Sequence, residues 1–170
     1  MSSRFPILLY HRVGPPNGSY MDAYTVSPEA FLGQMEQIRR EGWRPISIKA
    51  ALGDDTQKRS GRPVAITFDD GYASNREYAW PILEEFGFPS DNFVVTGRLA
   101  QANTWDGPDN GTWPLLSREE LAGAAGGLMK FQPAVWKTAL RRLLRLWAVL
   151  RPKGKPCTCP SSRHRSCGPT

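Results

Sequence analysis

The sequence predicts an α/β fold built on a parallel sheet, and three observations support this. Short apolar runs typical of strands alternate with helical patterns from residue 7 to residue 125. The clearest strand pattern, Val64 to Phe68, ends abruptly in Asp69-Asp70-Gly71. The chain has 170 residues, of which 40% are hydrophobic. That is enough for one packed domain, but a complete barrel of eight strand–helix units usually needs about 250 residues.

The elements before residue 60 begin with a strand and a helix. Residues 7–10 form a short apolar run of the buried-strand type, and a loop rich in Pro and Gly follows it. Ser27 is a candidate N-cap, with Pro28 at the first helical position, and apolar residues at helical spacing continue to Glu41. Residues 44–48 are expected to form a second strand, followed by a short helix to Leu52.

The elements after residue 60 repeat the same rhythm. The strand at 64–68 is followed by a predicted helix over 75–86, which Gly87 ends. Residues 93–96 predict a further strand. Ser117 and Glu120 form a capping box, which opens a helix toward residue 125.

Charge divides the chain into two segments. Residues 1–128 hold 12 Lys and Arg against all 16 Asp and Glu, a net charge of −4. Residues 129–170 hold ten Lys and Arg and no acid. Within that second segment, residues 134–150 read as one basic amphipathic helix, and residues 151–170 as a disordered tail. The chain contains no run of 18 apolar residues and no secretory signal at its start, so we expect no transmembrane helix and a cytoplasmic location.

Asp69 and Asp70 are the strongest candidates for chemistry. In a parallel α/β fold, residues that directly follow a buried strand lie at the edge where ligands bind. Two adjacent carboxylates repel one another unless a cation or a proton is shared. One carboxylate can then hold a divalent metal while the other accepts a proton from water. The alternative is a solvated Asp-Asp-Gly turn, because turns favour the same residues.

Several stretches in the same order resemble the polysaccharide deacetylases, also called the NodB-homology group or carbohydrate esterase family 4. Thr67-Phe68-Asp69-Asp70-Gly71 is similar to the first motif of that family. Residues 6–13, with Tyr10-His11, resemble the opening strand of the subgroup that begins with a Tyr-His pair. The resemblance also includes Tyr24–Glu29, residues 88–97 and residues 115–125. It covers roughly residues 5–128 and implies an incomplete NodB-type distorted barrel, about its first half, followed by the basic tail.

The resemblance implies metal-dependent removal of acetyl groups from an acetylated oligo- or polysaccharide, often with zinc. By position, Asp69 would be the general base and Asp70 a metal ligand. His11 ends the first strand at the same edge and is a candidate second ligand, although a structural, hydrogen-bonded imidazole is an equally good interpretation. For the substrate we expect contacts from Tyr72, next to the turn, and from Trp105, which could stack on a sugar ring or simply belong to a surface loop.

The family's His-x-x-x-His metal motif is missing from this sequence, whose only histidines are His11 and His164. We therefore expect a partial deacetylase domain over residues 5–128, a non-family tail over 129–170, and weak or no activity. A frameshift near Leu128 or another truncation would explain the change; the hypothesis fails if no other reading frame after that codon encodes His-x-x-x-His. The alternative function is a non-catalytic remnant that binds carbohydrate, or that acts as a basic protein associating with a membrane or with nucleic acid through residues 134–150. Nucleic acid is not an expected partner.

Overall fold

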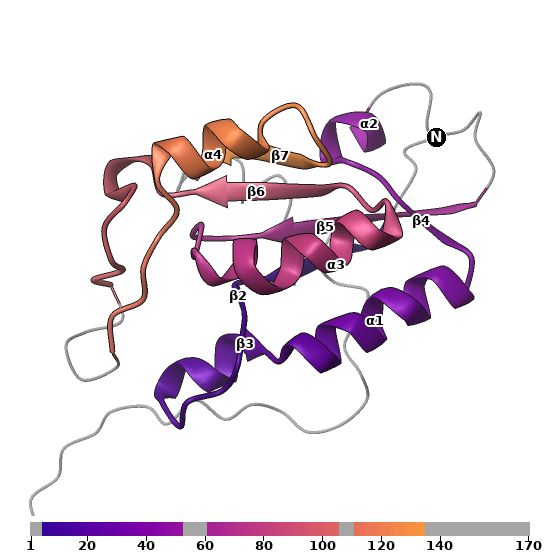
Figure 1. Cartoon of the computed structure of the whole chain (residues 1–170). Helices are drawn as coiled ribbons and strands as arrows, with labels where there is room; N and C mark the ends of the chain where they lie inside the picture. Colours follow the sequence, from indigo (N-terminus) through magenta and orange to yellow (C-terminus); the bar gives the residue numbers. More distant parts are fainter. Residues whose placement is uncertain (1–4, 53–60, 106–110, 135–170) are drawn as a thin grey trace, which may run out of the picture.

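The computed structural model describes residues 5–52, 61–105 and 111–134. These residues form a mostly parallel sheet with helices packed along it (Figure 1). The strands are β1 (Ile7–Tyr10), β2 (Arg12–Val13), β3 (Thr25–Val26), β4 (Trp43–Pro45), β5 (Arg62–Phe68), β6 (Ser90–Val94) and β7 (Met129–Pro133). The α-helices are α1 (Pro28–Arg40), α2 (Ile48–Leu52), α3 (Trp80–Phe86) and α4 (Arg118–Ala124), with shorter helical turns η1 (Tyr20–Tyr24), η3 (Asn75–Ala79) and η4 (Thr96–Arg98).

The sheet is organised around β5. Its strand order is β1-β5-β6-β7, all parallel, and β4 pairs with the first half of β5. The register sets Tyr10 opposite Phe68, so β1 and β5 end side by side. A separate two-stranded ribbon joins β2 to β3. The parallel α/β class predicted from the sequence is thereby confirmed for the described residues.

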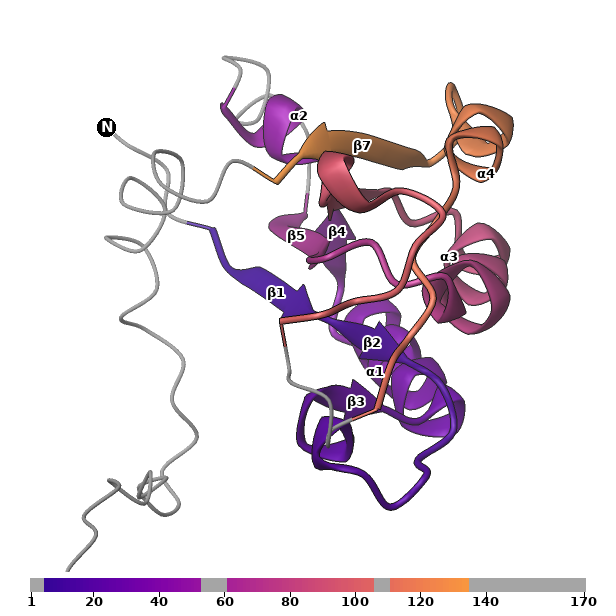
Figure 2. The same cartoon turned by 90° about the vertical axis from the view of Figure 1, so that its left-hand side faces the viewer.

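Alternate residues of β5 pack on opposite faces of the sheet, as the two-residue period of a strand requires. Val64, Ile66 and Phe68 belong to the main core, which α1 and α3 close, whereas Ala65 packs in a smaller cluster with Phe5 and Ile46 on the other face. Figure 2 shows α1, α3 and α4 along one side of the sheet. The carboxyl ends of the strands are left outside this packing, where loops can carry functional groups.

Helix α1 follows directly from its sequence. The Ser27 side chain accepts a hydrogen bond from the Ala30 amide at 3.2 Å, and Pro28 occupies the first turn. Phe31, Met35 and Ile38 form its buried stripe. The predicted helix is confirmed, and so is the capping box of Ser117 and Glu120 at α4.

Several elements differ from the sequence prediction. β4 begins at Trp43 and ends at Pro45, and the helix already begins at Ile48, where the Asp91 carboxylate accepts its amide hydrogen at 2.7 Å. The predicted helix over 75–86 begins with five residues of π-helix. β6 spans residues 90–94, earlier than the predicted 93–96, because its buried polar residues find hydrogen-bond partners.

A further difference is β7, which lies beyond the change in charge at residue 128. Residues 129–133 pair in parallel with β6, and the Met129 side chain is buried against the main core. The sheet therefore continues five residues past the boundary expected at residue 128. The predicted amphipathic helix (134–150) and tail (151–170) lie, apart from residue 134, outside the described residues. No helix in the described ranges has the length and apolar character needed to cross a bilayer.

Gly71, directly after the carboxylate pair, cannot be replaced without strain. Its φ is +76°, and a Cβ placed there would lie 3.0 Å from Cγ1 of Val94. We expect Gly71→Ala to lower the free energy of unfolding by about 1–3 kcal/mol. The matched control is Gly33→Ala in the middle of α1, where nothing lies within 4 Å of the new Cβ. That change should be neutral or stabilising by up to about 1 kcal/mol. Urea unfolding of both variants measures the difference, and equal effects would contradict the close packing at Gly71.

Candidate functional site

The candidate site lies where β1 and β5 end side by side. The Asp69 amide donates a hydrogen bond of 2.9 Å to the Tyr10 carbonyl, which is the last step of the ladder between the two strands. His11 follows Tyr10, and Asp70 follows Asp69. The structure thus brings His11, Asp69 and Asp70 to one edge of the sheet, as the sequence predicted from the parallel topology.

A tight turn at Asp70 separates the two carboxylates. Asp70 has a φ of +70°, and the Gly71 amide donates a 2.9 Å hydrogen bond to the Asp69 carbonyl two residues earlier. A positive φ with this hydrogen bond marks a γ-turn, which is a strained conformation for a residue other than glycine. The Leu116 amide in turn donates to the Gly71 carbonyl at 2.9 Å, which anchors the turn to a neighbouring loop. Strain retained by such anchoring is common at functional sites.

Burial makes Asp69 a stronger base than an ordinary aspartate. The side chain is half-buried, and desolvation raises its pKa from 3.8 to about 6. The charge of His11 opposes this rise, and the neighbouring charge of Asp70 adds to it. At neutral pH the Asp69 carboxylate is therefore mostly ionised, with a higher proton affinity than a solvated aspartate has.

His11 and Arg12 lie on the segment that continues β1. The His11 ring is half-buried, and its centroid lies 5.8 Å from that of the exposed Tyr24 ring. Arg12 is only 4% exposed and lies with its guanidinium 3.7 Å from the centre of the Trp113 ring. Its Nη1 donates to Thr25 Oγ1 at 3.0 Å. Burial lowers the pKa of Arg12, although the negative charge of Asp22 opposes this. Arg12 thus stabilises the loop behind the site.

The structure places the two expected substrate-binding aromatics differently. Trp105 is 39% exposed, and its ring meets the Tyr72 ring at a centroid distance of 6.4 Å. Tyr72 itself is 1% exposed and packs with Met21 and Leu115. In this arrangement Tyr72 supports Trp105 from inside, and Trp105 presents the accessible ring. Substrate contact by either residue stays a prediction.

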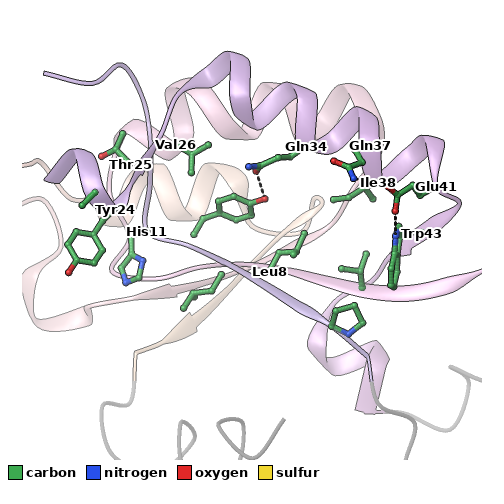
Figure 3. A pocket seen from close by; sticks show the side chains of 15 residues that line it. Leu8, His11, Tyr24, Thr25, Val26, Gln34, Gln37, Ile38, Glu41 and Trp43 are labelled. Carbon is green, nitrogen blue, oxygen red and sulfur yellow. Dashed lines mark hydrogen bonds between the residues drawn. The ribbon is translucent and has the colours of Figure 1, made fainter. Parts of the chain in front are cut away.

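A groove of about 600 Å³ runs along β1, on the side that faces α1, and includes His11 of the site. Figure 3 shows His11 and Tyr24 at one end and Glu41 and Trp43 at the other, with Leu8 between them. The polar groups on the α1 side bond to one another: the Tyr10 hydroxyl donates to Gln34 at 2.8 Å, and Gln37 donates to Glu41 at 2.7 Å. His11 is the residue that links this groove to Asp69.

The described residues do not complete a metal centre. Asp70 and His11 carry the oxygen and nitrogen donors that zinc accepts, but catalytic zinc normally takes three protein ligands. Across residues 5–52, 61–105 and 111–134, no group of three or more His, Cys, Asp or Glu side chains could hold a metal ion.

Sequence analysis missed one buried side chain that shapes the site. Asn75 is 1% exposed, and its side-chain amide binds the backbone on both sides of Arg12. The signal available was an Asn at the start of a predicted helix, four residues after the Asp-Asp-Gly turn. An Asn there is an ordinary helix-start residue, so the sequence did not distinguish it.

Taken together, these features define a parallel α/β domain with a carboxylate pair at the carboxyl edge of its sheet. Residues 56–127 match the family model described as polysaccharide deacetylase. The resemblance predicted from the sequence is confirmed: the family model matches this part of the chain, and the solved structures that the chain resembles are deacetylases of the NodB type.

Two curated relatives illustrate the similarity. "Putative polysaccharide deacetylase YxkH" of Bacillus subtilis (strain 168) is 32% identical over 95 residues, which cover 55% of this chain and 32% of that protein. Poly-beta-1,6-N-acetyl-D-glucosamine N-deacetylase of Staphylococcus aureus (strain MSSA476) is 28% identical over 111 residues, covering 56% of this chain and 37% of that one. The chain therefore spans about a third of the length of these relatives.

Solved structures agree on the fold. The structure of IcaB from Ammonifex degensii matches with a TM-score of 0.63 and 26% identity, covering 76% of this chain and 52% of that chain. The Streptococcus pyogenes deacetylase PplD in complex with acetate matches with a TM-score of 0.60 and 24% identity, covering 78% of this chain and 57% of that one. The described sheet thus corresponds to about half of these chains, in line with the incomplete NodB-type fold expected.

The raised pKa of Asp69 gives a testable pH dependence. An unfolded aspartate titrates near 3.9, whereas Asp69 in the folded protein titrates at about 6. Between these values the folded state binds more protons, so this residue makes stability fall as the pH rises through about 4 to 6. We expect Asp69→Asn to be more stable than the wild type by about 1–3 kcal/mol at pH 7.5, with little difference below pH 4.

The control variant, Glu29→Gln, is expected to change the pH dependence of stability in the opposite direction. Hydrogen bonds to the backbone and to Ser27 at the start of α1 lower the pKa of Glu29. The stabilisation that this carboxylate provides is therefore present at neutral pH and lost as the pH falls, so Glu29→Gln should be less stable than the wild type only at the higher pH. Thermal unfolding from pH 3.5 to 8 measures both variants. A pH-independent effect of Asp69→Asn would contradict the burial of Asp69.

Proposed function

We propose that this chain carries the general-base part of a deacetylase site, in which Asp69 activates water to remove an acetyl group from an acetylated oligo- or polysaccharide. The observation that supports this most strongly is the Asp69 carboxylate, half-buried at the sheet edge with a pKa of about 6. The similarity to a poly-beta-1,6-N-acetyl-D-glucosamine N-deacetylase supports the substrate class.

In the proposed reaction, Asp69 accepts a proton from a water molecule while the oxygen of that water attacks the acetyl carbonyl carbon. A new C–O bond forms, and the bond from that carbon to the sugar nitrogen or oxygen breaks. The proton then passes to the leaving amine or alkoxide, and acetate is released. A base with a pKa near the working pH is well suited to both transfers. Asp70 sits one residue away on a fixed turn, so its charge helps to hold the pKa of Asp69 high.

We further propose that a divalent ion such as zinc binds weakly to Asp70 and His11, and that turnover by this chain alone is low. Zinc would supply positive charge for the developing oxyanion. Two donors fall one short of the usual set, which supports weak binding. The sequence offers no His-x-x-x-His to supply the rest.

A second candidate function is carbohydrate binding without catalysis. The exposed rings of Tyr24 and Trp105, at 45% and 39% exposure, are aromatic surfaces of the kind on which sugars stack. Tyr24 also lines the groove that begins at His11. This candidate predicts sugar binding that is independent of Asp69.

An acetate-release assay on an acetylated chito-oligosaccharide, with added Zn²⁺, separates these functions. We expect a low rate for the wild type that falls about 100-fold or more in Asp69→Asn, because general-base catalysis typically contributes this much. The matched control is Asp91→Asn, since Asp91 is also a buried aspartate with a raised pKa, but lies on β6 and binds the Ile48 amide. Asp91→Asn should retain the wild-type rate.

Two outcomes would contradict the proposal. Equal acetate release by wild type and Asp69→Asn would remove Asp69 as the base, and fast turnover by the wild type would contradict the incomplete site. Calorimetric titration with Zn²⁺ tests the ligands separately. We expect weak binding that Asp70→Ala and His11→Ala each reduce, whereas binding unaffected by both changes would place the ion elsewhere.

A further inference from the structure

The ladder between β1 and β5 stops one residue before His11. Pairing runs from Ile7 opposite Ala65 to Tyr10 opposite Phe68, and the Asp69 amide makes the last bond to Tyr10. The γ-turn at Asp70 then takes the chain away from β1. The backbone of His11 to Val13 therefore extends beyond the strand that held it in register.

The side-chain amide of Asn75 continues this ladder. Its Nδ2 donates to the His11 carbonyl at 2.9 Å, and its Oδ1 accepts from the Val13 amide at 2.8 Å. In a parallel sheet, a neighbouring strand makes the same pair of bonds to the two residues on either side of one residue, here Arg12. Asn75 thus takes the place of a backbone residue of β5 beside β2, which also pairs with β3.

The Asn75 side chain is held in a buried position. Asn75 is 1% exposed and Val13 is 0% exposed, so water does not compete for the hydrogen bond between them, while the bond to the His11 carbonyl is partly buried. The backbone N–H of Asn75 donates to the Tyr72 carbonyl at 3.1 Å, and Asn75 begins the π-helix η3. A π-helical turn places side chains at unusual angles and is frequent at functional sites.

From this geometry we propose that Asn75 is a positioning residue, which fixes His11 relative to Asp69. The segment that carries the carboxylates is tied to the segment that carries His11 at two points: the Asp69–Tyr10 backbone bond and the Asn75 amide. Only Asn and Gln side chains carry a donor and an acceptor on one planar amide, and Gln is longer by one methylene. The positioning role of Asn75 matters for catalysis only within the proposed function, on which this inference rests.

Two substitutions separate the two hydrogen bonds. Asn75→Asp retains an acceptor for the Val13 amide but places an acceptor against the His11 carbonyl. Asn75→Ala removes both partners. In NMR spectra we expect the cross-relaxation between the His11 and Tyr24 rings, whose centroids lie 5.8 Å apart, to weaken several-fold in both variants. Hydrogen exchange of the Val13 amide should become at least about fivefold faster in Asn75→Ala and remain slow in Asn75→Asp.

The matched control is Asn92, a second buried asparagine with side-chain hydrogen bonds. It is 2% exposed, and its Nδ2 donates to Ser90 Oγ at 3.0 Å and to the Lys130 carbonyl at 3.4 Å. Asn92→Asp and Asn92→Ala should lower the melting temperature as the Asn75 variants do. They should leave the contact of the His11 and Tyr24 rings and the Val13 exchange rate unchanged. A purely structural role for Asn75 would give the same spectra in both sets of variants.

An unchanged His11–Tyr24 contact in the Asn75 variants would overturn the proposal. Where neither Asn75 variant folds, the wild type decides: a Val13 amide that exchanges like an unprotected amide overturns it, and strong protection supports it. The acetate assay on Asp69→Asn keeps the two proposals apart. The ring contact could be lost in the Asn75 variants while Asp69→Asn has no effect on acetate release. That result would support the positioning role of Asn75 and contradict the proposed function.

Discussion

The arrangement of the site depends on one backbone hydrogen bond, from the Asp69 amide to the Tyr10 carbonyl at 2.9 Å. It ends the pairing of β1 with β5 and thereby fixes which residues follow each strand at the same edge of the sheet. A register shifted by one residue would move every β5 side chain to the other face. Val64, Ile66 and Phe68 would then leave the main core, so packing and site geometry favour the same register.

Beyond that hydrogen bond, tight turns and a side-chain amide hold the site together where the regular strand pairing ends. The γ-turn at Asp70 reverses the chain within two residues, and Gly71 follows it with a second positive φ. The Asn75 amide supplies the hydrogen bonds that β5 no longer provides. Burial of the half-covered Asp69 carboxylate is what raises its pKa to about 6. The same packing that holds the turn thus gives the base its proton affinity, which links the strain of the fold to the proposed chemistry.

The sequence was sufficient to predict an element where its hydrophobic pattern and its capping residues indicate the same structure. β1, α1, β5 and the capping box of α4 follow from apolar periodicity and N-cap residues, and the edge location of Asp69 and Asp70 follows from parallel topology. β6 was misplaced because its buried face is polar: Ser90, Asp91 and Asn92 look like a turn until their partners are known. The pairing of β7 and the bonds of Asn75 are long-range, so no local pattern could reveal them.

The chain matches only part of the length of its relatives, and its described residues do not provide three metal donors at the site. The structural match covers 52% of the IcaB chain and 57% of the PplD chain. Within the described part of the chain, His11 directly follows β1 and Asp70 lies just after β5, but no group of three or more His, Cys, Asp or Glu could hold a metal ion. The proposed general base, combined with too few metal donors, would be consistent with the low rate proposed above.

The most direct test of this account is the NMR scalar coupling across the hydrogen bond between the Asp69 amide nitrogen and the Tyr10 carbonyl carbon in the full-length chain. The account predicts a measurable coupling together with slow exchange of the Asp69 amide, since the bond closes a buried ladder. A missing coupling with an amide that exchanges at an unprotected rate would show that β1 and β5 do not end together. His11 and the carboxylate pair would then not share one edge, and the proposed site would be wrong.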